Sequence, residues 1–395
     1  MVGSPWDGLI VVCGASWWEG TPLLEHHVAE ELTRYAPVLY VDPPSSLLTR
    51  FRNHDARSFA HSPGLRTVHD GLAVLSIRVP PLMERPVVKQ LALAAVRRGI
   101  RSGVRKLGAE RVHALVVPNL EPLFGSAGER HRVLYVKDDY VAGARLTGLP
   151  SRRLHRLSER LPQEADTVVA VSQVLADGLR GSGIETLLIP NGVDVAVFKD
   201  AGVPPASDGA PPVTAFVGHL SERVDVALLA AVADRGTRIR MIGPPQETMK
   251  EGHLGPLQAH PNVEWVGRVA YSDLGQALSD VTTCVLPYGN TAFNRASFPL
   301  KILEYLAAGR RVVSTDLPSV RWLDTPLVDR ADSVEDFAGA VERSLASPLT
   351  VAEIAERRAF AERHSWAART RLLADRLGLV AQATDTADRH GAGVP

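Results

Sequence analysis

The sequence predicts an α/β protein with two doubly wound domains, and three observations support this prediction. The chain has 395 residues, which is enough for two or three domains of about 150 residues each. Short apolar runs alternate with helical patterns along most of the chain, as in parallel sheets whose strands are joined by helices. The alternation stops at 199–212, KDAGVPPASDGAPP, where four prolines and two glycines predict a linker, and it resumes afterwards.

The first half of the chain predicts a sheet that begins with the apolar run LIVVC at 9–13. A glycine-rich turn follows at 14–20, and the stretch 45–70 is polar and irregular. Further strands are expected at 38–41, 72–79, 112–117, 132–136, 167–171 and 186–189. Helices are expected at about 22–35, 87–107 and 154–165, and from Ser172 to about Gly181.

The second half predicts a similar sheet and a closing helix. Strands are expected at 213–217, 238–242, 263–266, 282–286 and 311–315, with helices between them. The predicted domains are 1–198 and 213–350, followed by one helix at 351–380 that packs back toward the first domain and a flexible tail at 381–395. Ligands of such sheets bind at the carboxyl ends of the strands, so we expect the site in a central cleft between the two domains.

Composition and charge exclude several classes of protein. The 44 basic and 44 acidic residues cancel, which is unlike a nucleic-acid-binding protein. Six of the basic residues are lysine, an imbalance that we interpret as coding bias. Cys13 and Cys284 lie in apolar runs and cannot form a disulfide framework or a zinc site. Neither a signal peptide nor an apolar run of about 18 residues is seen, so a cytoplasmic protein is expected.

Several motifs of nucleotide and hydrolase chemistry are absent from the sequence. It contains no P-loop motif, no G-x-G-x-x-G after a strand and no G-x-S-x-G. No two aspartates stand at i and i+2, so the metal clamp with which many enzymes hold a sugar diphosphate is missing. We therefore expect no metal cofactor, and protein groups must neutralise any diphosphate that binds.

The segment 292–316 carries the most information about function. Ser297 is a candidate N-cap, and Pro299 would occupy the first helical position. Lys301 then falls in the first turn, where a cation opposes the helix dipole unless an anion binds. Glu304 lies one turn further on the same face. A cation and a carboxylate in this order suit a phosphate and a ribose diol, although a simple Lys301–Glu304 ion pair is an alternative.

Residues 299–315 and several other segments resemble a known family. PLKILEYLAAGRRVVST (299–315) closely resembles the nucleotide-sugar signature of GT-B glycosyltransferases, which are two-domain enzymes with Rossmann-like domains. ADTVVAVSQVL, LIPNGVDVAVF, VTAFVGHLSERVDVALL, VEWVGRVAYSDL and HSWAARTRLL follow the family's order, so that the resemblance covers about 9–380. The runs CGASWWEGTPLLEHHVAEELTRYAPVLYVDPPSS and VLYVKDDY resemble the surface-polysaccharide branch, with its teichuronic-acid and xanthan-type transferases.

The resemblance implies a site for a nucleotide sugar in the second domain. Glycines would let the backbone approach the diphosphate, Arg223 and Lys301 would be the main cations, and Glu304 would accept hydrogen bonds from the ribose. His219 stands where many relatives have arginine. The implied donor-binding residues are Gly218, His219, Arg223, Gly243, Gly267, Tyr271, Ser297, Pro299, Leu300, Lys301 and Glu304.

One departure from the family bears on mechanism. Retaining members carry E-x7-E, but Ala296 stands eight residues before Glu304, with Asn294, Arg295 and Ser297 around it. This departure favours an inverting reaction, which needs a general base near the acceptor hydroxyl. Asp138 is the preferred base, with Asp139 in an orienting role or as the cap of the next segment, and His26 is the alternative.

The turn after the first strand and the helix that follows it supply candidates for acceptor binding. The rings of Trp17 and Trp18 in this turn suit stacking on a sugar. His26 and His27 could instead lie at the boundary between the buried and exposed faces of the helix. The candidate residues are Gly14, Ser16, Trp17, Trp18, His27, Tyr140 and Asn191. The basic helix at 87–107 suits either an anionic lipid surface or the domain's own sheet.

The expected function is therefore glycosyl transfer without a metal. The donor is a nucleotide-diphosphate sugar, and the acceptor is a saccharide, a lipid-linked sugar or a small molecule. No nucleic acid is expected as a partner, and peripheral contact with the inner face of the cell membrane is the role foreseen for 87–107. The alternatives are a GT-B-fold epimerase and a sugar- or nucleotide-binding protein without catalysis.

Overall fold

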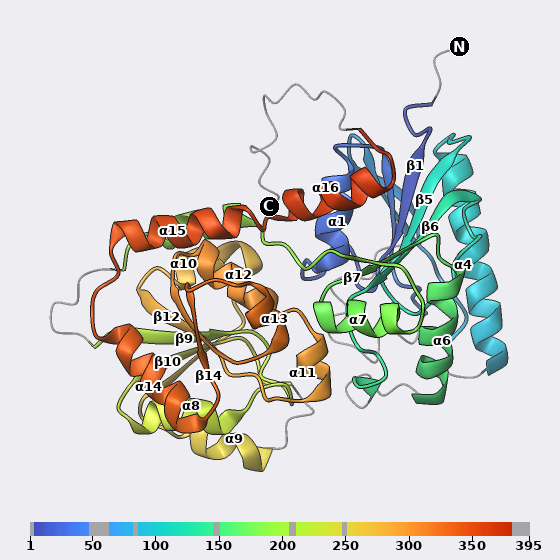
Figure 1. Cartoon of the computed structure of the whole chain (residues 1–395). Helices are drawn as coiled ribbons and strands as arrows, with labels where there is room; N and C mark the ends of the chain where they lie inside the picture. Colours follow the sequence, from blue (N-terminus) through green and yellow to red (C-terminus); the bar gives the residue numbers. More distant parts are fainter. Residues whose placement is uncertain are drawn as a thin grey trace. The chain divides into compact units, whose positions relative to one another are not determined.

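The computed structural model describes residues 4–46, 63–81, 86–144, 151–204, 211–246 and 251–380 (Figure 1). Contacts divide the chain into two compact units. The first comprises Met1–Tyr135, Arg160–Thr167 and Thr370–Pro395, and the second comprises Val136–Glu159 and Val168–Arg369. The expected tail at 381–395 lies outside the described residues, as does part of the expected linker, whose first residues instead end a 3₁₀ helix, η1 (Val195–Ala201).

The first sheet has eight strands in the order β3-β4-β2-β1-β5-β6-β7-β8. Its strands are β1 (Leu9–Cys13), β2 (Val38–Val41), β3 (Gly64–His69), β4 (Leu72–Ser76), β5 (Val112–Val117), β6 (Glu129–Val136), β7 (Thr167–Ala170) and β8 (Thr186–Leu188). The pairs β1–β2, β1–β5, β2–β4, β5–β6 and β7–β8 are parallel, as predicted. All residues of β1 and β2 are buried, because central strands of such a sheet are covered on both faces.

The edge strand β3 corrects the expectation that 45–70 is irregular. Gly64–His69 pairs antiparallel with β4, and none of its residues is fully buried. An edge strand exposed on both faces has no apolar alternation, so its sequence reads as loop. Residues 47–62 of the same stretch lie outside the described part.

The second sheet has six strands in the order β11-β10-β9-β12-β13-β14, all paired in parallel. Its strands are β9 (Val213–Val217), β10 (Arg238–Ile242), β11 (Val263–Gly267), β12 (Val281–Leu286), β13 (Arg311–Thr315) and β14 (Val328–Ala331). The chain starts at β9, builds outward through β10 and β11, and returns to build the other half from β12. The strand order therefore reverses between β9 and β12, which is where ligands of such sheets bind.

Helices connect the strands of both sheets. Those between strands of the first sheet are α1 (Leu24–Leu32), α4 (Pro86–Lys106), α6 (Ser151–Glu164) and α7 (Gln173–Gly181). The later ones are α8 (Val226–Asp234), α9 (Glu251–Gln258), η2 (Tyr271–Asp273), α10 (Leu274–Ala277), α11 (Ala292–Ala296), α12 (Leu300–Ala307), α13 (Pro318–Trp322), α14 (Val334–Leu345), α15 (Val351–Glu362) and α16 (Trp366–Arg376).

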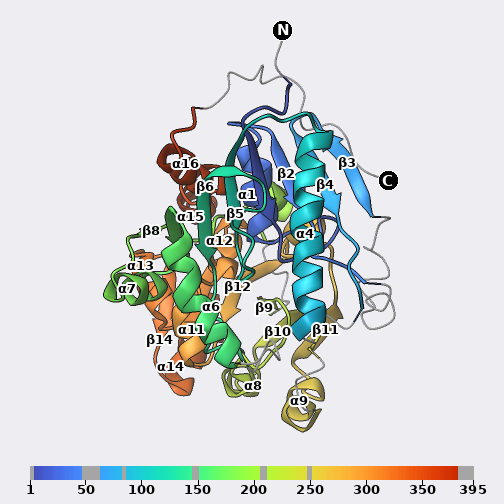
Figure 2. The ribbon, with the colours of Figure 1, turned by 90° about the vertical axis from the view of Figure 1, so that its right-hand side faces the viewer.

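Each sheet has its own hydrophobic core. In the first core, Val96, Ile100 and Val104 of α4 pack with Leu39 and Leu75 of the sheet, and Figure 2 shows α4 running beside the strands. The second core joins side chains of α8 and α14, including Leu229 and Phe337, to the strands. Two separate cores explain the restart of the sequence pattern after 212.

The closing helical pattern is not one helix, contrary to the prediction for 351–380. It forms α15 and α16, separated at 363–365. At this break His364 O accepts a hydrogen bond from Val193 N at 3.1 Å, and Trp366 N donates to Val193 O at 3.2 Å. The backbone at the break thus forms hydrogen bonds with Val193. A contact with such a distant residue cannot be predicted from the apolar periodicity of 351–380.

Two features are absent from the described residues. No helix among them is long and apolar enough to cross a membrane. No group of three or more His, Cys, Asp or Glu side chains within the described ranges is arranged to hold a metal ion.

Candidate functional site

Three glycine turns meet at the carboxyl ends of β9, β10 and β11. Gly218, Gly243 and Gly267 have φ values of 144°, 128° and 79°, in the region that favours glycine. Gly218 N donates to Ile242 O at 2.9 Å, and Gly243 N donates to Gly267 O at 2.7 Å. A Cβ atom on Gly243 would lie 2.2 Å from Gly218 O. Close packing therefore excludes a side chain at Gly243, and the positive φ values favour glycine at all three turns.

Lys301 and Glu304 of α12 lie beside these turns. Lys301 Cε is 3.9 Å from the position of a Cβ atom on Gly218. Its Nζ donates to Glu304 Oε2 at 2.5 Å, and Glu304 is only 1% exposed. Burial, together with the Glu304 carboxylate, raises the pKa of the Tyr271 hydroxyl. Lys301 and Glu304 thus form the ion pair considered as the alternative, next to the Gly218 turn.

The start of α12 corrects the predicted cap. The helix begins at Leu300, Pro299 occupies the N-cap position, and no side chain caps the helix. Ser297 Oγ instead donates backward to Phe293 O at 2.8 Å. The reason is that 292–296 forms a short helix of its own, α11, whose N-cap is Thr291. Ser297 therefore ends one helix and does not begin the next.

Three consecutive carbonyl oxygens just before α12 accept hydrogen bonds from side chains. The bonds run from Ser172 Oγ to Ala296 (2.5 Å), from Ser319 Oγ to Ser297 (2.6 Å) and from Asn191 Nδ2 to Phe298 (3.2 Å). They hold the loop that places the amino end of α12 and Lys301. Asn191, predicted to bind the acceptor, contacts this loop, while the roles of Ser172 and Ser319 were not foreseen.

Arg223 extends from the loop after β9 toward the loop after β12. Its guanidinium carbon lies 4.6 Å from the centre of the Tyr288 ring and 5.1 Å from that of Phe293. Its Nε donates to Asn294 Oδ1 at 2.9 Å. Arg223 is therefore held at the point where the strand order reverses. Its neighbour Asn294 was noted in the sequence only as a residue near the missing glutamate.

The remaining predicted donor residues also lie at this edge. His219 is exposed next to Gly218, and Leu300 is half-buried in the first turn of α12. Tyr271 begins η2, and its ring meets Phe198 of η1 edge-on at 6.4 Å between centroids.

The turn after β6 carries the candidate base. Asp139 Oδ1 accepts hydrogen bonds from Val141 N (3.1 Å) and Ala142 N (2.9 Å), so this carboxylate closes the turn. Asp138 and Tyr140 are half-buried beside it. A Cβ atom on Gly143 would lie 2.7 Å from Phe293 Cε2, which puts the turn against the ring that packs on Arg223.

The loop after β1 is built around Glu25, which is 1% exposed. Its Oε1 accepts from Ala15 N (3.1 Å) and from Ser16 Oγ (2.9 Å), and Tyr40 Oη donates to Ser16 O at 2.7 Å. A Cβ atom on Gly14 would lie 2.1 Å from Tyr40 Oη. Gly14 and Ser16, predicted to bind the acceptor, thus also hold the loop in shape.

The aromatic residues of this loop pack on one another. Trp17 Nε1 donates to Pro43 O at 3.2 Å, and the Trp18 ring lies 5.4 Å from that of His26. His26 Nδ1 accepts from Leu23 N at 3.1 Å, and Nε2 lies 3.0 Å from Trp17 O. Both ring nitrogens contact backbone, so His26 would have to leave these bonds to act as a base.

His27 differs from its neighbour in its ionisation. Burial, together with the adjacent His26, lowers the pKa of His27 to about 4. The imidazole is therefore neutral near pH 7. A neutral ring suits hydrogen bonding to a hydroxyl better than pairing with an anion.

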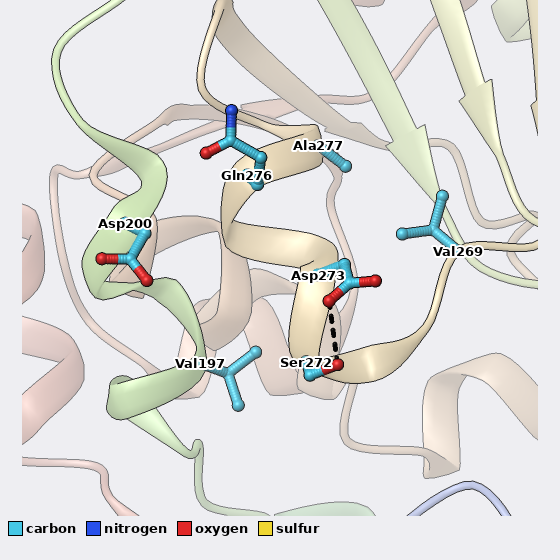
Figure 3. A pocket seen from close by; sticks show the side chains of 7 residues that line it. All are labelled: Val197, Asp200, Val269, Ser272, Asp273, Gln276 and Ala277. Atoms are coloured by element: carbon cyan, nitrogen blue, oxygen red, sulfur yellow. Dashed lines mark hydrogen bonds between the residues drawn. The ribbon is translucent and has the colours of Figure 1, made fainter. Parts of the chain in front are cut away.

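A separate cavity of about 500 Å³ lies between η1 and α10 (Figure 3). Its lining residues are Val197, Asp200, Val269, Ser272, Asp273, Gln276 and Ala277. Ser272 Oγ donates to Asp273 Oδ1 at 3.0 Å. The two carboxylates would repel a diphosphate, and neither Arg223 nor Lys301 lines the space, so we do not place the phosphates there.

Two mainly parallel sheets in succession, each joined by helices, are the architecture of the GT-B fold. A sucrose-phosphate synthase from Thermosynechococcus elongatus superposes with a TM-score of 0.71 at 16% identity, covering 94% of this chain and 98% of that one. HepE from Anabaena, in complex with UDP and glucose, superposes at 0.65 with 14% identity, covering 93% and 99%. At these identities the likeness establishes the fold, and it confirms the predicted fold class.

A similarity to a known family lies within the second half of the chain. Residues 211–347 match the family described as Glycosyl transferases group 1. TuaH of Bacillus subtilis, assigned to teichuronic acid biosynthesis as a glycosyltransferase, is 28% identical over 201 residues, 47% of this chain and 50% of TuaH. A phosphatidyl-myo-inositol mannosyltransferase of Mycolicibacterium smegmatis is 30% identical over 149 residues, 35% of this chain and 36% of the relative. The chain thus spans half or less of these relatives.

Proposed function

We propose that this protein is a glycosyltransferase that moves a sugar from a nucleoside-diphosphate sugar to a hydroxyl group of a saccharide, lipid-linked or small-molecule acceptor. The single observation that carries the proposal is Lys301 beside the Gly218 turn in the segment that matches Glycosyl transferases group 1. A structural neighbour, HepE, holds UDP and glucose. Another, from E. coli, holds UDP-2-fluoro glucose.

Two side chains would neutralise the diphosphate without a metal. Lys301 and Arg223 lie at the carboxyl edge of the second sheet, and Arg223 is held by aromatic rings and an amide. As the bond between the sugar and the phosphate breaks, negative charge develops on the leaving phosphate oxygen. Cations held in place before the reaction stabilise that charge with little reorganisation.

We further propose an inverting reaction with Asp138 as general base. Ala296 replaces the carboxylate of retaining members, and its carbonyl accepts a hydrogen bond from Ser172. Asp138 lies half-buried in the turn after β6, and its neighbour Asp139 closes that turn by accepting from Val141 N and Ala142 N. The base takes the proton of the acceptor hydroxyl, whose oxygen then attacks the anomeric carbon opposite the leaving diphosphate.

The direct experiment incubates purified protein with UDP-, GDP- and dTDP-sugars and saccharide acceptors in EDTA. We expect transfer to an acceptor, with inverted anomeric configuration in the product by NMR and a rate within about twofold of that with Mg²⁺. Release of an epimerised donor in place of a glycosylated product would support the epimerase alternative. Absence of both turnover and nucleotide binding would contradict the proposed function.

We also propose that α4 contacts the inner face of the cell membrane. Arg98, Arg101 and Arg105 are exposed on one face of the helix, which contains no acidic residue. Among the described residues none of the three has an ion-pair partner, and Leu91, also on α4, is 58% exposed. The opposite face is taken up by the first core. An exposed row of cations beside apolar residues suits anionic lipid.

Replacing Arg98, Arg101 and Arg105 together by alanine should weaken binding to phosphatidylglycerol-containing vesicles about 100-fold, because each basic side chain near an anionic surface contributes about 1 kcal/mol. Vesicle sedimentation measures the partition coefficient. Pure phosphatidylcholine vesicles are the control, and they should bind both proteins weakly. Equal binding of wild type and variant to anionic vesicles would refute the role of α4.

A further inference from the structure

The side-chain amide of Asn294 binds both the main chain and the side chain of Arg223. Asn294 is 1% exposed on α11. Its Nδ2 donates to Arg223 O at 2.9 Å and to Gly289 O at 2.8 Å. Its Oδ1 accepts from Arg223 Nε at 2.9 Å. Both amide hydrogens and the oxygen are thus engaged, and the loops after β9 and β12 are joined through one side chain.

Two aromatic rings also restrict the orientation of the Arg223 guanidinium group. The Tyr288 and Phe293 rings lie 4.6 and 5.1 Å from its carbon, within the range of cation–π contact. With Nε bound to Asn294, the two terminal nitrogens form the edge that is left for a ligand. Arg223 is half-buried, which strengthens its interaction with an anion relative to a fully exposed side chain.

The chemistry of this support differs from that at two other arginines of the same domain. Arg235 pairs with Glu335 and Glu342, and Arg240 pairs with Glu264 and Asp280. These arginines are held by carboxylates, which cancel their charge. Arg223 is held by a neutral amide, and no carboxylate among the described residues pairs with it. It therefore keeps its full positive charge while its position is fixed.

We propose that Asn294 is a positioning residue for the leaving diphosphate. It orients Arg223 toward that group without neutralising it. The inference rests on the proposed function, since it assigns a partner to a cation of the same site. It also explains why an acidic residue is unsuitable at this position: a carboxylate would accept from Nε but would face the carbonyl oxygens of Arg223 and Gly289 without hydrogens.

The test measures UDP and GDP binding by calorimetry for Asn294→Ala, Asn294→Asp, Arg223→Ala and the double variant Asn294→Ala/Arg223→Ala. We expect Asn294→Ala to weaken binding of the preferred diphosphate about tenfold, the size of one charge-assisted hydrogen bond, and Asn294→Asp to weaken it at least as much. In the Arg223→Ala background, Asn294→Ala should add less than about twofold. The corresponding nucleoside, which has no phosphate, should bind all variants equally.

Two controls separate positioning from a loss of folding. Asn262→Ala removes another amide that donates to a backbone carbonyl, that of Ala233, and should leave diphosphate binding unchanged. Arg223→Lys keeps the charge and the Asn294 side chain but removes the bond between them, and we expect it to lose about tenfold because lysine has no guanidinium Nε to donate to Asn294 Oδ1. Wild-type affinity in Arg223→Lys, or an equal effect of Asn294→Ala in both backgrounds, would overturn the inference. Failure of the wild type to bind any diphosphate would instead reject the proposed function.

Discussion

Replacing Lys301 by alanine is expected to lower kcat/KM for the donor sugar by about 10²–10³, the effect of removing one preorganised stabiliser of a developing oxyanion. Lys301 lies beside the Gly218 turn, and its amine donates to Glu304 Oε2. When a diphosphate binds, the amine would turn to the phosphate oxygens, and Glu304 would become available to the ribose. Initial-rate kinetics together with UDP titration measure both effects.

The matched control for this variant is Lys199→Ala. Lys199 is an exposed lysine of η1 in the same unit, and its loss should leave kcat/KM unchanged. Because Lys301→Ala also leaves the buried Glu304 without its cation, the thermal unfolding temperature is measured alongside the kinetics. A folded Lys301→Ala protein with wild-type kcat/KM would exclude Lys301 from the donor site.

Replacing Asp138 by asparagine should lower kcat by about 10²–10⁴, the usual contribution of a general base, while the dissociation constant for UDP changes less than about twofold. The amide has nearly the same shape as the carboxylate but cannot take the proton of the acceptor hydroxyl. Single-turnover transfer and UDP calorimetry on the same preparation separate catalysis from binding.

Asp139→Asn is the matched control for Asp138→Asn. Its amide oxygen can still accept from Val141 N and Ala142 N, so the turn should survive and kcat should fall much less. Transfer that persists in Asp138→Asn would remove this residue as the base. A larger loss of kcat in Asp139→Asn than in Asp138→Asn would assign the role of base to Asp139.

The buried strands could be predicted from the sequence because each is a local apolar run. The runs at 9–13 and 213–217 coincide with β1 and β9, in which every residue is buried. The edge strands β3 and β14 were missed because neither has a continuous apolar run: no residue of β3 is fully buried, and only the first and last residues of β14 are. Local patterns also joined α15 and α16 into one helix, since the bridge to Val193 is a distant contact.

The candidate site divides in a similar way. The glycine turns and Lys301 belong to short motifs that can be read along the chain, whereas the partners of Arg223 cannot. Arg223 and Asn294 are 71 positions apart, and Ser172 lies 124 positions from the carbonyl that it holds. The short helix α11 likewise gives Ser297 a different role: Ser297 ends α11 and donates to Phe293 O, and it does not cap α12.

The sequence by itself determined the fold class, the family resemblance and the residue types of the donor site, because these depend on local runs, turns and contiguous motifs. Only the tertiary structure decided which of those residues meet and which are already engaged. It paired Lys301 with Glu304, closed the turn with Asp139, and placed the neutral Asn294 against Arg223. The physical reason is that hydrogen bonds and charge pairs depend on distances between atoms, and folding alone brings distant segments within those distances.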